Sequence, residues 1–315
     1  MKIAFHINKL CVTGISVALY DYALYNEKLY NNTSIILIPE KSIADCEPIA
    51  LNKFSKRFLV RTYKDLEEIL SCLKCDILYC IKYGINDGIY SKNIKTVIHC
   101  VYDMTDSHGN IYAGISCNLI KKFNKHLFVP YMVSLKKIHN NNLKILLGIP
   151  NDAIVFGRYG SIYTFNIPWI SKVIEKIVKT RDDIYFLLNN TVLFDYHPQI
   201  KYYKNIVSED DKNKFINTCD AYIECGTIGH SFGLAIAEFS TFNKPIIAYN
   251  GQDIQNTAHF DVLKDNALYF QDEKQFKSLL NNFKKEDYID KDLNFYKEYT
   301  PENVMKKFNE VFLTE

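Results

Sequence analysis

Three consecutive stretches decide the fold: AYIEC (221–225), GHSFGLAIAEF (229–239) and KPIIAYN (244–250). The first and third are short and apolar, which is typical of buried strands, and the middle stretch has apolar residues at helical spacing. A strand, a helix and a second strand in this order form the unit from which parallel sheets are built. Packing against a sheet requires only the apolar residues of the helix. Packing does not explain the polar residues His230 and Glu238, so the stretch 229–239 is also a candidate binding or catalytic site.

The same alternation of strands and helices runs along the whole chain of 315 residues. In the first half, we expect strands at 2–7, 34–39, 57–60, 76–81, 95–102 and 126–129, and helices at 17–30 and 64–73. In the second half, we expect strands at 153–158, 184–190, 221–225, 245–249 and 267–270, and helices at 210–218, 233–243, from Pro168 (capped by Asn166), from 272 and from Thr300. The apolar stripe of the helix from Pro168 would be Ile170, Val173, Ile174 and Ile177. This alternation predicts parallel sheets with helices on both faces.

Two domains are expected from the length and from one polar connection. Residues 134–152 are polar and then marked by Gly and Pro, which suits a link between domains. We therefore predict an α/β protein with two doubly wound, Rossmann-like parallel-sheet domains, 1–140 and 150–292. Residues 293–315 would form a helix that crosses back to the first domain. Ligands of such sheets bind at the carboxyl ends of the strands, so the site is expected in a central cleft faced by both domains.

Composition and charge exclude several classes of protein. The net charge is +2 and the lysines are scattered, so no basic footprint for nucleic acid is present. The nine cysteines do not form a disulfide framework, and no apolar run is long enough to be a transmembrane segment. The first residues lack the apolar core of a signal peptide. These features predict a cytoplasmic protein and leave a weak contact with a membrane surface open.

The start of the helix at 233–243 has the features of an anion site. Its first backbone N–H groups are free and the positive end of its dipole faces the strand ends, while Gly233 allows a phosphate to approach closely. Glu238 lies about 7.5 Å further along the axis, where a carboxylate can accept from both hydroxyls of a ribose. His230 precedes the tip. The alternative interpretation is a helix that only packs on a sheet, with Ser231 as its N-cap and Glu238 in solvent.

This stretch resembles the E-x7-E segment of retaining GT-B glycosyltransferases that use nucleotide sugars, a family-4-like type written E-x-F-G-[LF]-x-x-x-E. The chain supplies SFGL at 231–234 and the second acid, Glu238, while His230 stands at the first acid position. A little-characterised branch of that superfamily is similar over most of the chain. Its features are MKIAFHINKL, GISVALYDYALYN, HGNIYA, VPYMVSL, VFGRYG, INTCDA and SFGLAIAEF.

The resemblance implies a function and a set of roles. It implies transfer of a hexose from a nucleotide-diphosphate sugar to an unknown acceptor, such as a glycan hydroxyl, with retention of configuration and without a metal or other cofactor. Glu238 would bind the donor ribose, and His230 and His108 would contact the transferred sugar or the acceptor. Catalysis would rest on positioning and on stabilising the leaving group, so no nucleophile is assigned. The expected catalytic residues are His230, His108 and Arg158, and the expected donor-binding residues are Gly14, Arg158, Ser231, Phe232, Gly233, Leu234 and Glu238.

Arg158 closes the first strand of the second half, where a guanidinium can bind phosphate oxygens in bidentate fashion. Better-known family members carry an Arg and a Lys in the following loop, and this chain has GSIYTFNI there. Arg158 is therefore expected to carry the leaving-group charge alone. A salt bridge is the alternative role.

Other motifs are set aside. Cys72 and Cys75 have metal-like spacing but no second pair, and Asp290 and Asp292 lie in a polar run away from any nucleotide-binding strand. The glycine-rich dinucleotide fingerprint and the P-loop are absent.

Two other functions remain open. His230 in place of an acid, together with the missing basic loop residues, suits a descendant that binds a sugar nucleotide or glycan with little or no catalysis. A nucleotide-sugar epimerase on the same fold is the other.

Overall fold

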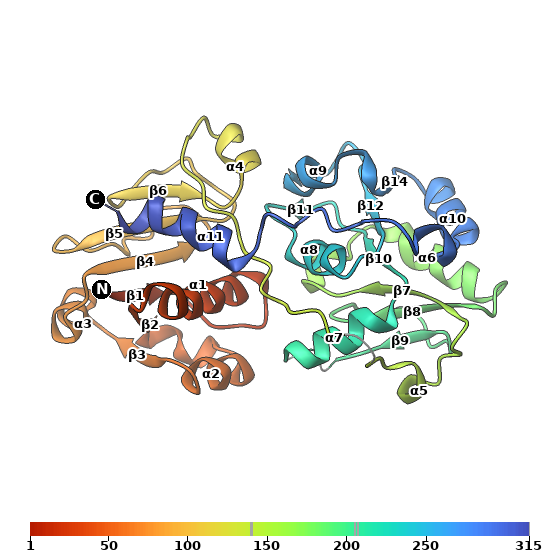
Figure 1. Cartoon of the computed structure of the whole chain (residues 1–315), viewed down its shortest axis with the longest axis horizontal. Helices are drawn as coiled ribbons and strands as arrows, with labels where there is room; N and C mark the ends of the chain where they lie inside the picture. Colours follow the sequence, from red (N-terminus) through yellow and green to blue (C-terminus); the bar gives the residue numbers. More distant parts are fainter. Residues whose placement is uncertain (139–140, 205, 207, 315) are drawn as a thin grey trace. The chain divides into compact units, whose positions relative to one another are not determined.

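The computed structural model describes residues 1–138, 141–204, 206 and 208–314, which belong to two units (Figure 1). Unit 1 comprises Met1–Ser134 and Glu298–Glu315, and unit 2 comprises Leu135–Lys297. Of the predicted segments, the connection 134–152 contains residues 139 and 140, the domain 150–292 contains residues 205 and 207, and the closing segment 293–315 contains residue 315. These five residues lie outside the described part of the chain.

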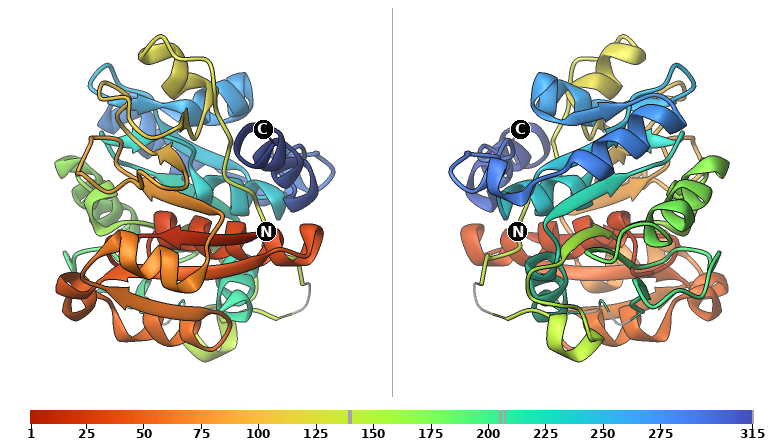
Figure 2. Two further views of the ribbon diagram at one scale, coloured as in Figure 1. Left: turned by 90° about the vertical axis from the view of Figure 1, so that its left-hand side faces the viewer. Right: turned by 90° about the vertical axis from the view of Figure 1, so that its right-hand side faces the viewer.

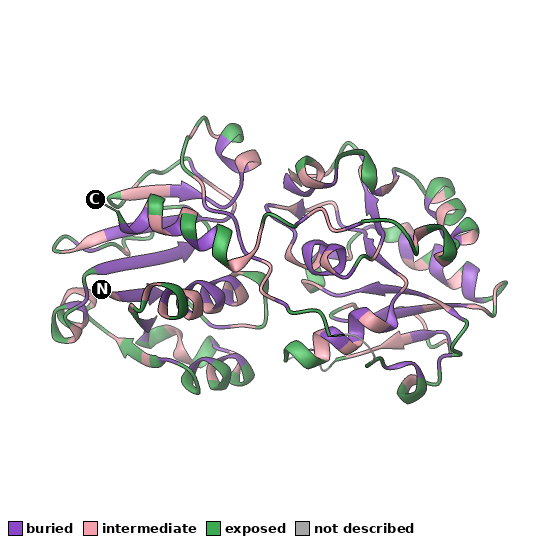
Figure 3. Ribbon diagram, viewed as in Figure 1, coloured by how far each residue is buried: buried purple, intermediate pink, exposed green. Residues whose placement is uncertain are grey.

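Unit 1 is built on a six-stranded sheet in the order β3-β2-β1-β4-β5-β6, and all of its pairings are parallel. Its strands are β1 (Lys2–His6), β2 (Thr33–Pro39), β3 (Leu59–Tyr63), β4 (Ile77–Lys82), β5 (Lys95–Cys100) and β6 (Ile111–Gly114). The strand order reverses between β1 and β4. Both strands are almost wholly buried (Figure 3), as expected for strands covered on both faces.

The helices of unit 1 include the closing segment of the chain. They are α1 (Gly14–Tyr30), η1 (Glu40–Asp45), α2 (Pro48–Ser55), α3 (Leu66–Leu73), α4 (Cys117–Lys122), α11 (Pro301–Phe308) and η5 (Asn309–Leu313). Phe308 of α11 stacks on Tyr22 of α1 at a centroid distance of 5.2 Å and lies 5.3 Å from Tyr79 of β4. Aromatic contacts of this kind stabilise the fold by about 0.5–1.5 kcal/mol each, in addition to the stabilisation that comes from burying their apolar surface. Figure 2 shows the closing helix from two further sides.

One predicted strand of unit 1 is wrong, and one predicted helix begins at a different residue. The sixth strand is β6 at Ile111–Gly114 and not 126–129, which contributes only a single bridge, between Phe128 and Gly114. The helix expected at 17–30 is present as α1 but begins earlier, at Gly14. Its buried face runs through Ala18, Leu19, Tyr22, Ala23 and Asn26, and Leu29 is exposed.

Unit 2 repeats the architecture with the order β14-β12-β10-β7-β8-β9, again entirely parallel. Its strands are β7 (Ile154–Arg158), β8 (Ile184–Leu188), β9 (Ile200–Tyr202), β10 (Ala221–Glu224), β12 (Ile246–Tyr249) and β14 (Leu268–Phe270). A separate two-stranded sheet pairs β11 (Gly229–His230) with β13 (Asn256–Thr257). The order of the main sheet reverses between β7 and β10, which is where ligands bind in doubly wound sheets.

The helices of unit 2 cover both faces of its sheet. They are α5 (Lys144–Leu147), η2 (Ile162–Thr164), α6 (Pro168–Val178), α7 (Glu209–Thr218), α8 (Leu234–Thr241), α9 (Ala258–Leu263), η3 (Lys264–Asn266), α10 (Glu273–Asn282) and η4 (Lys285–Tyr288). In α6 the expected apolar stripe of Ile170, Val173, Ile174 and Ile177 is fully buried. Each such side chain contributes roughly 1.5–3 kcal/mol to stability. Asn166 does not cap α6, because its side chain bonds to Thr227.

The two sheets confirm the predicted fold class, two doubly wound α/β domains of Rossmann-like type. In the described part of the chain, no helix is both long and apolar enough to cross a membrane. The nine cysteines all lie among the described residues and are free thiols.

Candidate functional site

The start of α8 lies in unit 2, directly after the loop that follows β10. Gly233 is the N-cap residue, with a φ of +90°, and no side chain caps the helix. A left-handed backbone at this position favours glycine because any Cβ would be strained. The first-turn N–H groups have no partner within the helix itself. The packing-only interpretation expected Ser231 to be the N-cap, and this expectation is wrong, because Gly233 is the N-cap residue. The amides that were expected to bind a diphosphate lie at a helix start that no side chain caps.

His230 precedes this helix start on the short strand β11. Gly229 has a φ of +63° and lies so close to β13 that a Cβ would meet the Asn256 carbonyl oxygen at 2.0 Å. The glycine therefore allows the pairing that fixes the backbone of His230 beside Thr257. The His230 side chain is 18% exposed. Its buried Nε2 atom lies 2.7 Å from Glu224 Oε2, an ion-pair contact that lacks the alignment of a hydrogen bond within the described structure.

Glu224 is the last residue of β10 and is fully buried. Its Oε2 atom also accepts a hydrogen bond of 3.1 Å from the Tyr222 hydroxyl, whereas Oε1 has no partner among the described residues. Burial alone would raise the pKa of this carboxyl. The opposing effects of His230, Arg158 and His259 outweigh burial and lower the pKa. Glu224 is therefore a carboxylate held inside the protein by surrounding cationic and imidazole groups.

His259 completes this cluster from α9. Its ring lies 5.3 Å from the His230 ring at nearly a right angle, and it is completely buried. Neither ring nitrogen has a hydrogen-bond partner within the described residues. Burial, with a further contribution from His230, lowers the pKa of His259 to about 3. The ring is therefore neutral at physiological pH.

Glu238 is buried within α8 and is not a solvated surface residue, so this part of the packing-only interpretation is wrong. The Tyr159 hydroxyl donates to Oε2, and Lys212 Nζ of α7 lies 2.5 Å from Oε1. Burial and the neighbouring Glu238 carboxylate raise the pKa of Tyr159 well above its usual value, so the hydroxyl stays protonated and donates a hydrogen bond to that carboxylate. Each carboxylate oxygen has two lone pairs, so Glu238 retains acceptor capacity beyond these two bonds.

Arg158 ends β7, and its guanidinium is occupied by the protein itself. Nη1 donates to Asn189 O, Asn190 O and Thr191 Oγ1, and Nη2 donates to Ser161 O and Thr164 Oγ1, at 2.7–3.1 Å. The residue is 1% exposed. This geometry holds together the two loops that follow β7 and β8. Its expected role in phosphate binding stays a prediction.

The candidate residues of unit 1 are arranged differently. His108 Nδ1 bonds to Asp106 O at 2.7 Å and Nε2 lies 3.2 Å from Lys82 Nζ, so both ring nitrogens are engaged. Lys82 is buried and also bonds to Asp87 and to Ile89 O. Gly14 is the first residue of α1, and there is open space where its Cβ would be. His99 of β5 is a core residue that bonds to Tyr79 and Val129 O.

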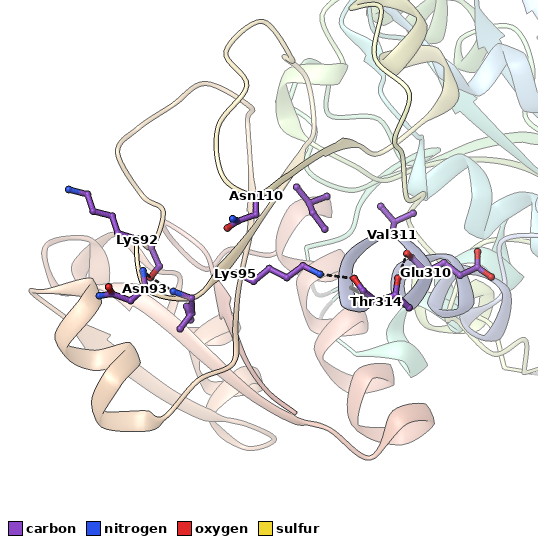
Figure 4. Close-up of a pocket in the computed structure, with 10 residues that line it drawn as sticks. Lys92, Asn93, Lys95, Asn110, Glu310, Val311 and Thr314 are labelled. Atoms are coloured by element: carbon purple, nitrogen blue, oxygen red, sulfur yellow. Dashed lines mark hydrogen bonds between the residues drawn. The ribbon is translucent and has the colours of Figure 1, made fainter.

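A surface hollow of about 640 Å³ in unit 1 lies elsewhere (Figure 4). It is lined by residues at the amino ends of β5 and β6, including Lys95 and Asn110, and by residues of the chain end such as Glu310 and Thr314. None of the predicted site residues lines it. No group of three or more His, Cys, Asp or Glu side chains in the described structure is arranged to hold a metal ion.

Sequence reasoning missed four residues of the unit 2 site: Glu224, His259, Lys212 and Tyr159. One of them had a readable signal, because Glu224 places a carboxylate at the end of the otherwise apolar strand AYIEC. The other three lie far along the chain from α8 or β11. Their proximity to the site follows only from the folded topology.

Comparisons with solved structures show the GT-B fold. No protein-family model matches the sequence, and no curated protein sequence matches it either. The structure is similar to that of HepE from Anabaena in complex with UDP and glucose, with a TM-score of 0.72, 12% identity and 98% of each chain covered. A glycosyltransferase from Rickettsia africae superposes with a TM-score of 0.64 at 12% identity, covering 99% of this chain and 94% of that one.

A UDP-N-acetylglucosamine 2-epimerase is also similar, with a TM-score of 0.59 and 11% identity over 99% of this chain and 96% of that one. At such identities the similarity establishes the fold, and it does not by itself assign an activity. The fold is therefore GT-B, as the sequence predicted.

Proposed function

We propose that the chain is a glycosyltransferase that moves a hexose from a nucleotide-diphosphate sugar to a hydroxyl acceptor with retention of configuration. One observation carries the proposal: the uncapped start of α8, with Gly233 at its tip and the buried carboxylate of Glu238 one turn inside. One neighbour of the same fold, HepE, supports it, since it was solved with UDP and glucose and, in a second structure, with UDP-glucose.

In this proposal the diphosphate binds the backbone N–H groups of Phe232, Gly233 and Leu234, where the positive end of the helix dipole favours an anion. These groups stabilise the negative charge that develops on the leaving nucleotide. Ser231 lies at the same turn. No metal ion or organic cofactor takes part in the proposed reaction.

Glu238 accepts from the ribose hydroxyls of the donor. Tyr159 and Lys212 hold the carboxylate in place, and Lys212 adds a positive charge at this end of the sheet. Arg158 contributes charge from the end of β7. His230 contacts the transferred sugar. The roles expected for Gly14 and His108, which belong to unit 1, stay predictions. The proposed location of the protein is the cytoplasm.

The direct test is a thermal-shift screen with UDP, GDP, ADP and their sugars, followed by analysis of products with and without acceptor hydroxyls. A nucleotide that binds the folded state at 100 times its Kd stabilises it by about 2.7 kcal/mol. We expect one nucleotide and its sugar to raise the melting temperature, and we expect transfer of that sugar. Absence of binding by every nucleotide would refute the proposal.

Two alternatives have their own observations. His230 at the first acid position favours a binding protein with little turnover, and an epimerase shares the fold. Binding of a sugar nucleotide without transfer or hydrolysis would identify the first. Conversion of the sugar nucleotide to its epimer in the absence of an acceptor would identify the second.

A further inference from the structure

The contact between Glu224 and His230 joins two residues that lie six positions apart and belong to different sheets. Glu224 ends β10 of the main sheet and His230 lies on β11 of the small sheet. The carboxylate reaches His230 at Nε2, 2.7 Å away, on the buried side of the ring. Nε2 is therefore not part of the 18% of the His230 side chain that is exposed to solvent.

We propose that Glu224 is a positioning residue that holds His230 by Nε2 and supplies the negative charge that the E-x7-E pattern has at position 230, so that the two residues act as one unit on the transferred sugar. This inference rests on the proposed function. It assigns to the donor site a residue that the E-x7-E pattern does not include.

Burial of the carboxylate argues for such a role. A carboxylate inside a protein is destabilising unless it is paired and hydrogen-bonded, and replacing a buried ion pair by apolar residues is often neutral or stabilising. Glu224 is 1% exposed and ends a strand whose other residues are buried, yet its Oε1 atom has no partner among the described residues. Packing alone would be served better by an apolar residue. A carboxylate kept there indicates chemistry that needs the charge.

The surroundings define what the pair presents to a ligand. Tyr222 of β10 donates to Glu224, Arg158 of β7 acts on it as a nearby cation, and His259 of α9 packs against the His230 ring. The negative charge of a carboxylate 2.7 Å from Nε2 favours the imidazole form with a hydrogen on that nitrogen. The other nitrogen, Nδ1, is then an acceptor in the neutral ring and a donor in the protonated ring. A sugar hydroxyl can bond to either form.

A different role for the pair would be purely structural, as a link between the two sheets of unit 2. The structural role requires only that the contact exists. The positioning role requires that the charge on Glu224 affect the intact sugar nucleotide but not the bare nucleotide. The two roles are therefore separable by comparing UDP-glucose with UDP as probes.

The test uses the full chain with three changes: Glu224→Gln, His230→Ala and both together. We expect Glu224→Gln to reduce affinity for UDP-glucose and its turnover about 10- to 100-fold, by analogy with the loss of a partner that orients a metal-ligating histidine. Affinity for UDP should stay within about twofold. The double variant should be no worse than His230→Ala, because residues acting as one unit are not additive. Glu273→Gln, which breaks an exposed ion pair with Lys176 in the same unit, is the matched control.

A charge exchange sharpens the test. The variant with Glu224→His and His230→Glu puts a carboxylate back at the position where the E-x7-E pattern has one and keeps the pair. We expect it to recover most of the activity that either single change loses. Additive single effects, or a Glu224→Gln variant indistinguishable from Glu273→Gln toward UDP-glucose, would overturn the inference.

A measurement without any ligand separates this inference from the proposed function. Nitrogen-15 NMR of the imidazole reports which nitrogen of His230 carries hydrogen. In the unmodified protein we expect Nε2 to be protonated, and in Glu224→Leu, which removes the acceptor, this preference should be lost. An unchanged spectrum would overturn the inference even if nucleotide sugars bind. If the spectrum changes but no nucleotide binds, the pair is real and the proposed function is wrong.

Discussion

The two units share one strand order but differ at the point where that order reverses. In unit 1, Lys82 at the end of β4 bonds to Asp87, Ile89 O and His108, and the second nitrogen of His108 bonds to a carbonyl. In unit 2, Glu224 at the end of β10 keeps one oxygen without a partner, and His259 keeps two nitrogens without one, within the described residues. The same topological position is thus closed in one unit and incomplete in the other.

An incomplete polar cluster has an energetic meaning. A buried polar group without a hydrogen bond costs about 1–3 kcal/mol, and native proteins contain few of them. A cluster of such groups next to an uncapped helix start indicates that a ligand or ordered water completes it. The comparison therefore supports the proposed donor site in unit 2, whereas His108 belongs to the internal hydrogen-bond network of unit 1.

Of the substitutions that test this difference between the two units, Gly233→Val at the tip of α8 is expected to have the largest effect on ligand affinity. The substitution forces a β-branched residue into a φ of +90° and removes the close approach to the backbone. We expect the affinity for both UDP and inorganic pyrophosphate to fall about 100-fold, or about 2.7 kcal/mol. Isothermal titration measures both.

Gly148→Ala is the matched control, because Gly148 also has a left-handed backbone, with a φ of +62°, and has open space around it. It should lower the free energy of unfolding by about 1 kcal/mol without changing nucleotide affinity. Equal loss of pyrophosphate binding in both variants would show that α8 does not hold the diphosphate.

A smaller and more selective effect is expected from Glu238→Ala. If Glu238 binds the pentose, the variant should bind UDP about tenfold more weakly and bind pyrophosphate, which has no pentose, almost as before. The measurement is the ratio of the two affinities. Because Tyr159 and Lys212 lose their acceptor, melting of the variant should be recorded alongside. An unchanged ratio would contradict the ribose role.

The smallest effect concerns pH and the buried histidines of the two units. The pKa of His6 is lowered to about 3 and that of His99 to about 4 in unit 1, and that of His259 to about 3 in unit 2, in each case mainly by burial. The unfolded chain takes up protons near pH 6.5 while the folded chain does not, so stability is present above that pH and is lost as the pH falls.

Between pH 7 and pH 6 we expect the free energy of unfolding to fall by about 0.7 kcal/mol for each of these histidines. Denaturant unfolding at the two pH values measures the sum, and hydrogen exchange divides it between the units. A stability that is equal or higher at pH 6 would contradict the buried, neutral state of these rings.

The sequence was sufficient for features that depend on local pattern. The stripe Ile170, Val173, Ile174 and Ile177 predicted α6, and the order of strands and helices predicted two doubly wound sheets. It was insufficient where pairing depends on distant segments. Strand β6 has only four residues and directly follows the polar run DSHGN (106–110), and Asn166 bonds to Thr227 rather than to α6.

The candidate site divides in the same way. Gly233 and Glu238 were readable because they belong to one helix, whose geometry fixes their separation. The contact of Lys212 with Glu238 joins α7 and α8, and that of His259 with His230 depends on the pairing of β11 with β13. No periodicity in the sequence encodes these contacts. For the same reason, the sequence could not predict that the Arg158 guanidinium donates its hydrogen bonds to the two loops that follow β7 and β8.

The most direct test of the account is a crystal structure of the full chain with UDP. The account predicts that the diphosphate oxygens lie within hydrogen-bond distance of the backbone nitrogens at 232–234 and that the ribose hydroxyls face Glu238. A nucleotide bound at any other place, or an α8 start closed by packed side chains when UDP is present, would contradict it.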